Sequence, residues 1–402
     1  MKAVIIGAGK IGRGLIAGIC QMNGIEYSFI ENDGMLTAQM QKERQYLLHV
    51  LERRERVISM KTAEIWSLED TEAAERAILD ADLIFTAVGG KHLGEVGEYL
   101  GERLEHILTE RSCSRPLNII VHENWKYTER DLHEGIRKIL SLEKRELFEE
   151  IVGINMALSM GLSVEPPDEE SKKTEPLGIW MQDRWNIFVN KALWKGDLPK
   201  IKGVGFVDHF LQLQNQALYT NNASSAVISY LGHRKGYQYV AEAARDPEIE
   251  RIVDEAYQEI ETALIRQLHV FPKDQREFAR QAREKYRDER IHDTVVRHAR
   301  DPIRKLGPEE RLLAPARMAM ASGIRPTALA AGIAAALYYE DENDPSACEL
   351  KHLREENGIS AVLQEICGLE EGCELEKLIL EQVQNLFCQD KKTTEWQEHC
   401  HL

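Results

Sequence analysis

The chain is short of positive charge. Its 402 residues include 51 lysines and arginines against 67 aspartates and glutamates, a formal net charge of −16. Nucleic acid and anionic membrane surfaces repel a protein of this sign, so neither is expected as a partner. The negative net charge does not exclude a small anionic ligand, because a local cluster of basic side chains can still bind it. The expected partner is therefore a small-molecule substrate.

Long apolar runs and a cysteine framework are also missing. No stretch reaches the roughly 18 apolar residues of a membrane-spanning helix, and the start, "MKAVIIGAGKIGRG", turns glycine-rich too early for a signal-peptide core. The seven cysteines show no C-x-x-C spacing, which indicates reduced thiols, and no metal site is expected. These absences predict a cytoplasmic protein, and the sequence leaves its oligomeric state open.

The first half of the chain alternates between strand and helix patterns. "KAVII" at 2–6, a helical stretch and "EYSFI" make strand, turn, helix and strand in about 30 residues, the size of a βαβ unit. Further buried strands are expected at 81–89, 117–124 and 150–159, and the partly alternating stretch 46–67 predicts a small antiparallel excursion. The alternation favours a parallel, doubly wound sheet of the Rossmann type.

The second half reads as helices bounded by proline and glycine. A chain of 402 residues exceeds the size of one hydrophobic core, so two domains are expected. The predicted boundary is near "KGDLPKIKG" at 195–203, which gives a Rossmann domain at 1–200 and a helical substrate domain at 201–402. The expected fold class is α/β followed by a mainly all-α part.

The glycine-rich turn "GAGKIG" predicts a dinucleotide site. Glycine is needed first for the tight turn, next so that the backbone can approach a pyrophosphate, and last for close packing of helix and strand. Glu31 follows Gly12 at the end of the second strand, where a carboxylate accepts the ribose hydroxyls and repels a 2′-phosphate. NAD is therefore favoured, although the nearby cations Lys10 and Arg13 leave NADP open.

At this point the chain resembles a known family. "MKAVIIGAGKIGRG", "DLIFTAVG", "NIIVHEN", "LYTNNASSAVISYLG" and "DPIRKLGPEERLLAP" follow one another as they do in the polyol-specific long-chain dehydrogenases, the mannitol-1-phosphate 5-dehydrogenase family. The resemblance implies NAD-linked oxidation of a secondary alcohol on a polyol or polyol phosphate, without a metal. The implied cofactor contacts are Gly7, Ala8, Gly9, Lys10, Ile11, Gly12, Arg13 and Glu31, with Val88 and Asn124 beside the nicotinamide half.

The substrate side departs from that family. The family motif has a lysine as general base, then an asparagine and a histidine that polarise the carbonyl oxygen, and here these positions hold Ala217, Asn222 and Ser225. Asn222 and Ser225 are expected at the start of a helix, as capping residues or as contacts to a substrate oxygen. His122 and Lys126, near the end of a predicted strand, are the candidates for a replacement base.

Two functions follow from this pattern. The first is an NAD-dependent oxidoreductase with a rebuilt substrate site, in which Asn222 orients the oxygen and another group takes the proton. The second is an NAD-binding pseudoenzyme or ligand sensor without turnover. Several substrate-side positions differ together, since Met156, Met160 and Gly161 stand where the family has charged residues, and this favours the first function.

Overall fold

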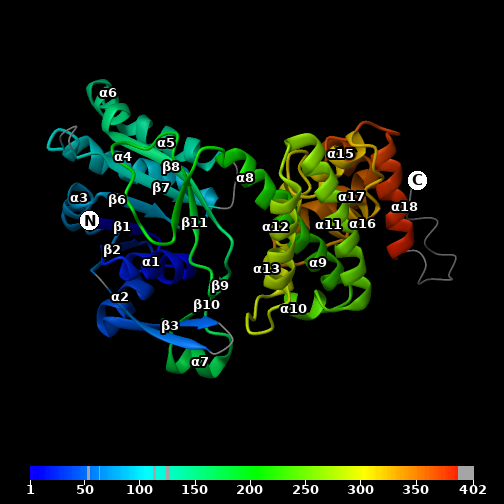
Figure 1. The fold of residues 1–402 in the computed structure, drawn as a ribbon, viewed down its shortest axis with the longest axis horizontal. Helices are drawn as coiled ribbons and strands as arrows, with labels where there is room; N and C mark the ends of the chain where they lie inside the picture. The colour runs from blue at the N-terminus through cyan, green and yellow to red at the C-terminus, as the bar shows by residue number, and fades with distance from the viewer. Residues whose placement is uncertain (52–54, 63, 112–114, 124–126, 388–402) are drawn as a thin grey trace. The chain divides into compact units, whose positions relative to one another are not determined.

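The computed structural model describes the 402-residue chain except residues 52–54, 63, 112–114, 124–126 and 388–402. It divides into two compact units, Met1–Phe210 and Leu211–Leu402. In the described part of the chain all strands belong to the first unit, and the second unit is built from helices (Figure 1). None of the described helices combines the length and apolar character needed to cross a membrane.

The first unit contains two sheets and the helices that cover them. Its strands are β1 (Lys2–Ile6), β2 (Glu26–Glu31), β3 (Gln45–Leu51), β4 (Arg56–Lys61), β5 (Ile65–Ser67), β6 (Leu83–Thr86), β7 (Leu117–His122), β8 (Val152–Ser159), β9 (Ser163–Val164), β10 (Ile179–Gln182), β11 (Ile187–Asn190) and β12 (Val204–Val207). Its helical segments are η1 (Gly12–Ile16), α1 (Ala17–Met22), α2 (Gly34–Glu43), α3 (Thr71–Asp80), η2 (Gly90–His92), α4 (Leu93–Ile107), α5 (Thr128–Ile139), α6 (Leu142–Ile151) and α7 (Glu169–Thr174).

The larger sheet has the doubly wound topology. Within the described residues it has eight strands in the order β12-β11-β8-β7-β6-β1-β2-β5, and only β8 and β11 pair antiparallel. The chain proceeds from β1 to β2 on one side and later returns to β6 on the other, so the strand order reverses between β1 and β6. In such sheets ligands bind outside the carboxyl ends of the strands at this reversal.

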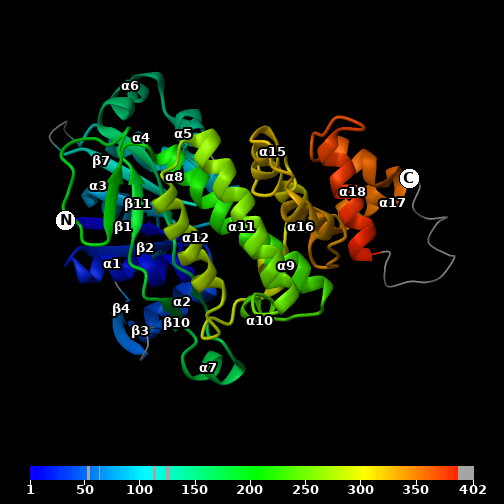
Figure 2. The same ribbon diagram turned by 45° about the vertical axis from the view of Figure 1, so that its right-hand side comes forward.

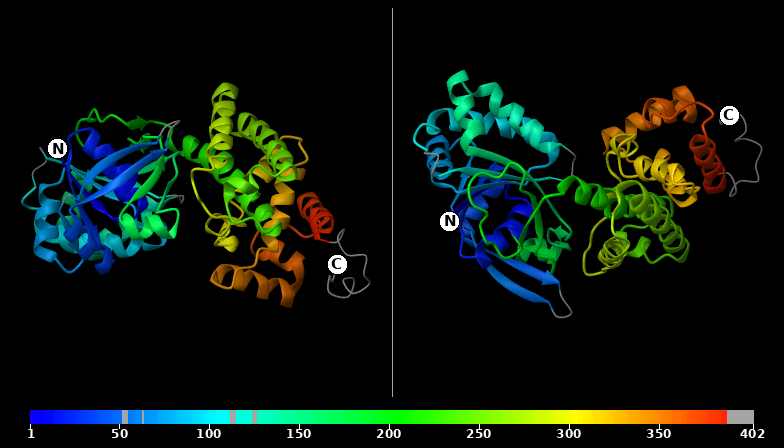
Figure 3. Two further views of the ribbon diagram at one scale, coloured as in Figure 1. Left: turned by 90° about the horizontal axis from the view of Figure 1, so that it is seen from below. Right: turned by 45° about the horizontal axis from the view of Figure 1, so that its top comes forward.

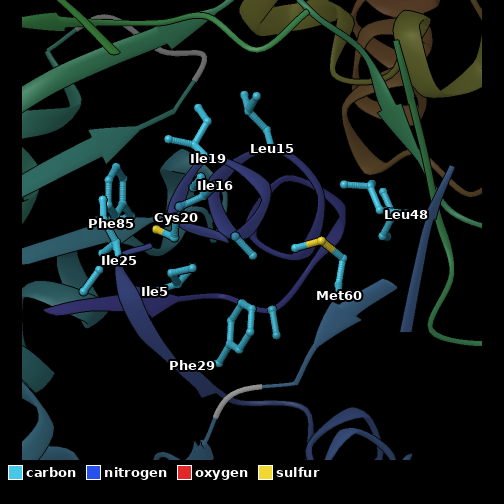
Figure 4. Packing of buried hydrophobic residues seen from close by; sticks show 14 of the residues in the cluster. Ile5, Leu15, Ile16, Ile19, Cys20, Ile25, Phe29, Leu48, Met60 and Phe85 are labelled. Carbon is cyan, nitrogen blue, oxygen red and sulfur yellow. The ribbon is translucent and has the colours of Figure 1, made fainter. Parts of the chain in front are cut away.

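Both faces of this sheet are packed. Ala3 and Ile5 of β1 join one apolar cluster, and the alternate residues Val4 and Ile6 join another. The first cluster includes side chains of η1, α1 and the smaller sheet. Figure 4 shows Ile5 beside Ile16, Ile19 and Cys20. The second cluster takes its helical side chains from α3, α4, α5 and α6. The period-2 alternation of β1 therefore places the strand at the centre of the unit.

The smaller sheet has the order β4-β3-β10-β9. Its strands β3 and β4 form the antiparallel excursion expected between residues 46 and 67, and the blue hairpin is visible in the right-hand view of Figure 3. One part of that expectation is wrong, because β5 leaves the hairpin and pairs parallel with β2 in the larger sheet. The apolar stretch after residue 176 likewise divides between the sheets, with β10 in the smaller and β11 in the larger.

The second unit is a helical assembly around two buried helices. Its elements are α8 (Phe210–Gln216), η3 (Ala217–Asn222), α9 (Ala223–Arg234), α10 (Val240–Ala243), α11 (Pro247–Leu268), α12 (Pro272–Tyr286), α13 (Val295–Ala299), α14 (Pro302–Lys305), α15 (Leu313–Ala321), α16 (Thr327–Leu337), α17 (Pro345–Glu365) and α18 (Glu374–Phe387). Nearly every residue of α9 and α16 is buried. Figure 2 shows the long helix α11 beside α9 and α12. A helix that is apolar all round, such as α16, belongs in a core.

Candidate functional site

The glycine-rich turn lies between β1 and η1, and each glycine has different surroundings. Gly7 has φ +97°, and a Cβ on it would lie 2.6 Å from the Ala87 carbonyl oxygen. A Cβ on Gly12 would lie 2.1 Å from the Gly7 carbonyl oxygen. A Cβ on Gly9 would meet nothing within 4 Å. Gly7 and Gly12 are therefore required by packing, whereas Gly9 leaves open space over the backbone, which fits a pyrophosphate.

Lys10 and Ile11 form the first turn of the helix that follows. Ile11 packs against the apolar cluster below the turn, while Lys10 stays partly exposed. The Arg13 N–H donates to the Gly9 carbonyl oxygen at 2.9 Å, which continues the helix from the turn. Free N–H groups at such a start, together with the helix dipole, favour an anion.

Glu31 is fixed against the turn. Its Oε2 accepts the Ala8 N–H at 2.6 Å, and its Oε1 accepts the N–H groups of Asn32 and Asp33 at 2.8 and 2.9 Å. A carboxylate has about four acceptor positions, so these bonds leave capacity for a ribose hydroxyl. The carboxylate thus stands at the end of β2, where the sequence predicts an adenosine contact, and its charge disfavours a 2′-phosphate.

The side chain of Arg13 points into the fold, whereas the family resemblance implies that it contacts a pyrophosphate. The side chain is buried, its Nε donates to the Ala8 carbonyl oxygen at 2.6 Å, and its Nη1 donates to the Leu177 carbonyl oxygen at 2.7 Å. Burial lowers the pKa of its guanidinium. Tyr46 donates its hydroxyl to the Arg13 carbonyl oxygen at 2.5 Å. Arg13 therefore supports the turn from inside the fold, which is a different role from direct contact with a pyrophosphate.

The loop after β6 contacts both the glycine-rich turn and the end of β7. A Cβ on Gly7 would come within 3.0 Å of Val88 Cγ1. On the other side, Glu123 Oε1 accepts the N–H groups of Val88 and Gly89 at 2.8 and 3.1 Å, and Oε2 accepts the Gly89 N–H at 3.1 Å. Burial raises the pKa of Glu123 to about 7. Val88, predicted to lie by the nicotinamide, is thus held in place by a residue that the sequence predictions omitted.

Glu123 carried one usable signal in the sequence. It directly follows the buried strand β7, at the carboxyl edge where ligands bind, and it stands between the two candidates His122 and Asn124. Nothing in the sequence, however, shows that the N–H groups of Val88 and Gly89 come to this carboxylate. Asn124 and Lys126 lie outside the described residues.

His122, proposed as a replacement base, is the last residue of β7 and is buried. Burial lowers the pKa of its imidazole to about 4. Within the described part of the chain its Nε2 is enclosed and has no hydrogen-bond partner. An imidazole that binds a proton this weakly is a poor proton acceptor at neutral pH. The environment of His122 is thus unfavourable to the predicted role.

In the second unit, Asn222 and Ser225 lie inside a continuous helix, and the expectation that they start one is wrong. The chain passes from α8 through the π-helical turn η3 into α9, and Asn222 has φ −79° and ψ −28° without a side-chain cap. The wider π turn accommodates the polar residues without interrupting the helix. Such single π turns inside α-helices occur frequently at functional sites.

The amide of Asn222 is the accessible polar group of this turn. Its Oδ1 accepts from Asn221 Nδ2 at 3.2 Å, and its Nδ2 has no acceptor among the described residues. Asn222 is partly exposed. Ser225 is buried, and its Oγ donates to the Asn222 carbonyl oxygen at 3.1 Å. The turn therefore presents an amide N–H donor at Asn222, while the hydroxyl of Ser225 is already used within the helix.

The described residues do not contain a cluster of metal-ligating side chains. No group of three or more histidine, cysteine, aspartate or glutamate side chains there could hold a metal ion. The polar groups described above are the carboxylates of Glu31 and Glu123 in the first unit and, in the second unit, the amide of Asn222. These groups suit hydrogen bonding to a cofactor and to a substrate oxygen.

Comparisons with known proteins agree with this architecture. The family model described as the mannitol dehydrogenase Rossmann domain matches residues 1–191, and the one described as the mannitol dehydrogenase C-terminal domain matches residues 210–387. Mannitol-1-phosphate 5-dehydrogenase of Thermoanaerobacter pseudethanolicus is 30% identical over 376 residues, covering 93% of this chain and 95% of that one. The enzyme of the same name from Bacillus subtilis is 31% identical over 386 residues, covering 95% of this chain and 100% of that one.

Solved structures show the same fold at low sequence identity. Pseudomonas fluorescens mannitol 2-dehydrogenase, in a ternary complex with NAD and D-mannitol, matches with a TM-score of 0.73 and 14% identity, covering 96% of this chain and 91% of that one. A substrate-free D-sorbitol dehydrogenase matches with a TM-score of 0.75 and 13% identity, covering 95% and 91%.

Together these findings confirm the predicted fold class and the predicted family. The expectations of an oxidoreductase and of NAD as its cofactor agree with the same matches. The matched regions include both units and almost the whole described chain. The chain belongs to the mannitol dehydrogenase family.

Proposed function

We propose that this protein is an NAD-dependent dehydrogenase that interconverts a polyol, a polyol phosphate or a related sugar-derived substrate with its carbonyl form. The observation that carries the proposal is the turn between β1 and η1. Gly7 and Gly12 are locked by close packing, Gly9 is open, and Glu31 is fixed beside them. NAD, when bound there, supplies the hydride acceptor.

The substrate oxygen is assigned to Asn222. Its partly exposed amide offers a donor that can polarise a carbonyl oxygen or orient a hydroxyl, and the π turn holds the backbone beside it. The relatives named mannitol-1-phosphate 5-dehydrogenase and mannitol 2-dehydrogenase act on polyols or their phosphates by their names. The proposed substrate class rests on those names and on the resemblance of the segment around Asn222 to the family motif.

The group that would accept the proton of the substrate hydroxyl is not identified among the described residues. Ala217 replaces the family lysine, and Ser225 replaces the histidine but uses its hydroxyl within the helix. A buried His122 with a pKa of about 4 is a poor substitute. Lys126, outside the described residues, stays a proposed base. Loss of a positioned general base costs about 10²–10⁴ in rate, so we expect slow oxidation of simple polyols near neutral pH.

The second candidate is an NAD-binding protein without turnover. The identity of Ala217 favours it, because a methyl group cannot take a proton. The locked glycine-rich turn supports cofactor binding in both candidates, so binding alone does not separate them. A sensor would bind NAD and a polyol phosphate firmly and leave both unchanged.

Enzyme assays separate the two candidates. The purified protein is first tested for NAD binding, and NADH absorbance is then followed with polyols, polyol phosphates, sugar acids and their keto forms. Turnover that falls at least about tenfold in Asn222→Ala, with NAD affinity retained, supports the dehydrogenase. Lys126→Ala tests the proposed base in the same assay. Firm NAD binding with no turnover on any substrate would establish the sensor instead.

A further inference from the structure

Glu123 is a half-buried carboxylate, and its hydrogen bonds to the described residues all come from neutral donors. Its two oxygens accept the backbone N–H groups of Val88 and Gly89, and no ion pair joins it to another described residue. Burying a carboxylate is costly unless a positive charge or several donors compensate it. Two N–H groups compensate in part, and the pKa of Glu123 stays raised to about 7 because burial dominates. Among the described residues, the ionised carboxylate of Glu123 therefore lacks a positively charged partner.

The described charged and titratable groups around Glu123 supply no such partner, and Lys126 lies outside the described residues. His122, the preceding residue, is buried, and its pKa is lowered to about 4, so it is neutral near pH 7. On the element that follows Val88 and Gly89, Lys91 is exposed, and His92 Nδ1 pairs with Glu95 at 3.3 Å. Within the described part of the chain, burial raises the pKa of this carboxylate, and the N–H groups of Val88 and Gly89 lower it.

The position of Glu123 in the sheet indicates where a positive charge can come from. A dinucleotide binds across the strand-order reversal, with one nucleotide on each half of the sheet. Glu31 at the end of β2 marks the adenosine half. The segments that follow β6 and β7, which carry Val88 and Glu123, belong to the other half, where a bound dinucleotide would place its nicotinamide. The oxidised nicotinamide ring carries a positive charge, and the reduced ring is neutral.

We propose that Glu123 discriminates between the two redox states of the cofactor, because its ionised carboxylate supplies the counter-charge to the oxidised nicotinamide ring. This inference rests on the proposed function, since it needs NAD in the site. Glu123 acts as a positioning residue through its bonds to the Val88 and Gly89 N–H groups and as a negative charge at the predicted nicotinamide half of the sheet. The proposal assigns it no bond-making or bond-breaking step.

The sign of the pH dependence follows from the protonation state. Oxidised cofactor binds best when Glu123 is ionised, so its affinity rises with pH through about 7 and levels off above. For a group with a pKa of about 7, the protonated fraction falls from about nine-tenths at pH 6 to about one-tenth at pH 8. Oxidised NAD should therefore bind about tenfold more tightly at pH 8 than at pH 6, whereas NADH should change less than about twofold.

The test measures dissociation constants of both redox states by calorimetry from about pH 6 to about pH 8. Glu123→Gln keeps the shape and one acceptor but removes the charge, so it should bind oxidised NAD about tenfold more weakly at pH 8, with a flat pH profile and little change for NADH. Equal pH dependence for the two redox states in the unmodified protein overturns the inference, even where the variant fails to fold. Binding of neither state at any pH overturns the proposed function itself.

The second unit offers a matched control. Glu259 is a buried carboxylate that, like Glu123, accepts two consecutive backbone N–H groups, here from Ala328 and Leu329 at 2.8 and 2.9 Å, and burial raises its pKa to about 7. Glu259→Gln removes a carboxylate charge from the second unit, at a residue that is not among the predicted cofactor contacts. The pH profile for oxidised NAD should be unchanged in this variant. A flattened profile in Glu259→Gln would show a general titration effect and overturn the role of Glu123.

Discussion

At the scale of single residues, the three glycines of the turn differ in what a methyl group would meet. Gly12 would collide with a backbone oxygen at 2.1 Å, which cannot move without shifting the turn. Gly9 has open space instead. The same substitution therefore separates a packing requirement from a ligand requirement.

Gly9→Ala should weaken NAD binding at least about tenfold while leaving the melting temperature within about 2 °C, because the methyl group fills only the space meant for the pyrophosphate. Gly12→Ala should lower both binding and stability. Calorimetry and thermal melts measure the two effects. Gly94→Ala, also without a neighbour within 4 Å and on helix α4, is the matched control and should change neither. Normal NAD affinity in Gly9→Ala would contradict the assignment of the turn.

Glu31 sets the preference between the two dinucleotides. Glu31→Gln removes the negative charge that repels a 2′-phosphate and keeps one acceptor for the Ala8 N–H. We expect about tenfold weaker NAD binding and a smaller ratio of NAD to NADP affinity. Competition binding with both cofactors measures the ratio. An unchanged ratio would remove Glu31 from the adenosine site.

At the scale of elements, helices α9 and α16 pack closely because a glycine, Gly332, lies at their contact. A Cβ on Gly332 of α16 would lie 2.7 Å from Val227 Cγ2 of α9, inside a fully buried contact. Overpacking of this kind costs about 1–3 kcal/mol, of which the better helix propensity of alanine recovers about 1 kcal/mol.

Gly332→Ala should therefore lower the melting temperature of the second unit by a few degrees, about 2–4 °C per kcal/mol. The double variant with Val227→Ala should lose less than the sum of the two single losses, since the smaller neighbour makes room for the new methyl group. Thermal melts of the four proteins measure this coupling. Additive losses would show that the two side chains do not meet.

Some elements could be predicted from the sequence, and others could not. β1, β6, β7 and β8 are short apolar runs bounded by turns or helices, and a run of that kind has few alternatives in a parallel sheet. β5 was missed as a member of the larger sheet, because its pairing with β2 depends on contacts between distant segments. The helix through η3 was missed because asparagine and serine favour helix ends by local preference, and tertiary packing overrides that preference here.

The candidate site was predictable only in part. The glycine-rich turn and Glu31 form a local pattern with fixed spacing, and the structure places them together. Glu123 depends on two N–H groups that come from residues 88 and 89, far from it in the chain. The inward orientation of Arg13 depends on Leu177, which is further still. Long-range contacts of this kind are absent from any local pattern.

At the scale of the whole molecule, buried carboxylates link stability to pH. The pKa of Glu259 is raised to about 7 from 4.5 by burial, so the folded state binds its proton more tightly than the unfolded state. Its contribution to stability is full below about pH 4.5 and is lost as the pH rises through about 7. Glu259→Gln should therefore reduce the fall in melting temperature between about pH 5 and about pH 8. The same fall in both proteins would contradict the link.

The central claim is that this member of the mannitol dehydrogenase family transfers hydride to NAD. The most direct test follows NADH absorbance when the protein, oxidised NAD and a panel of polyols and polyol phosphates are mixed. The account predicts NADH formation with at least one substrate, slow near neutral pH, and its loss in both Gly9→Ala and Asn222→Ala. Saturating NAD binding with no NADH from any substrate, or turnover that survives both substitutions, would contradict it.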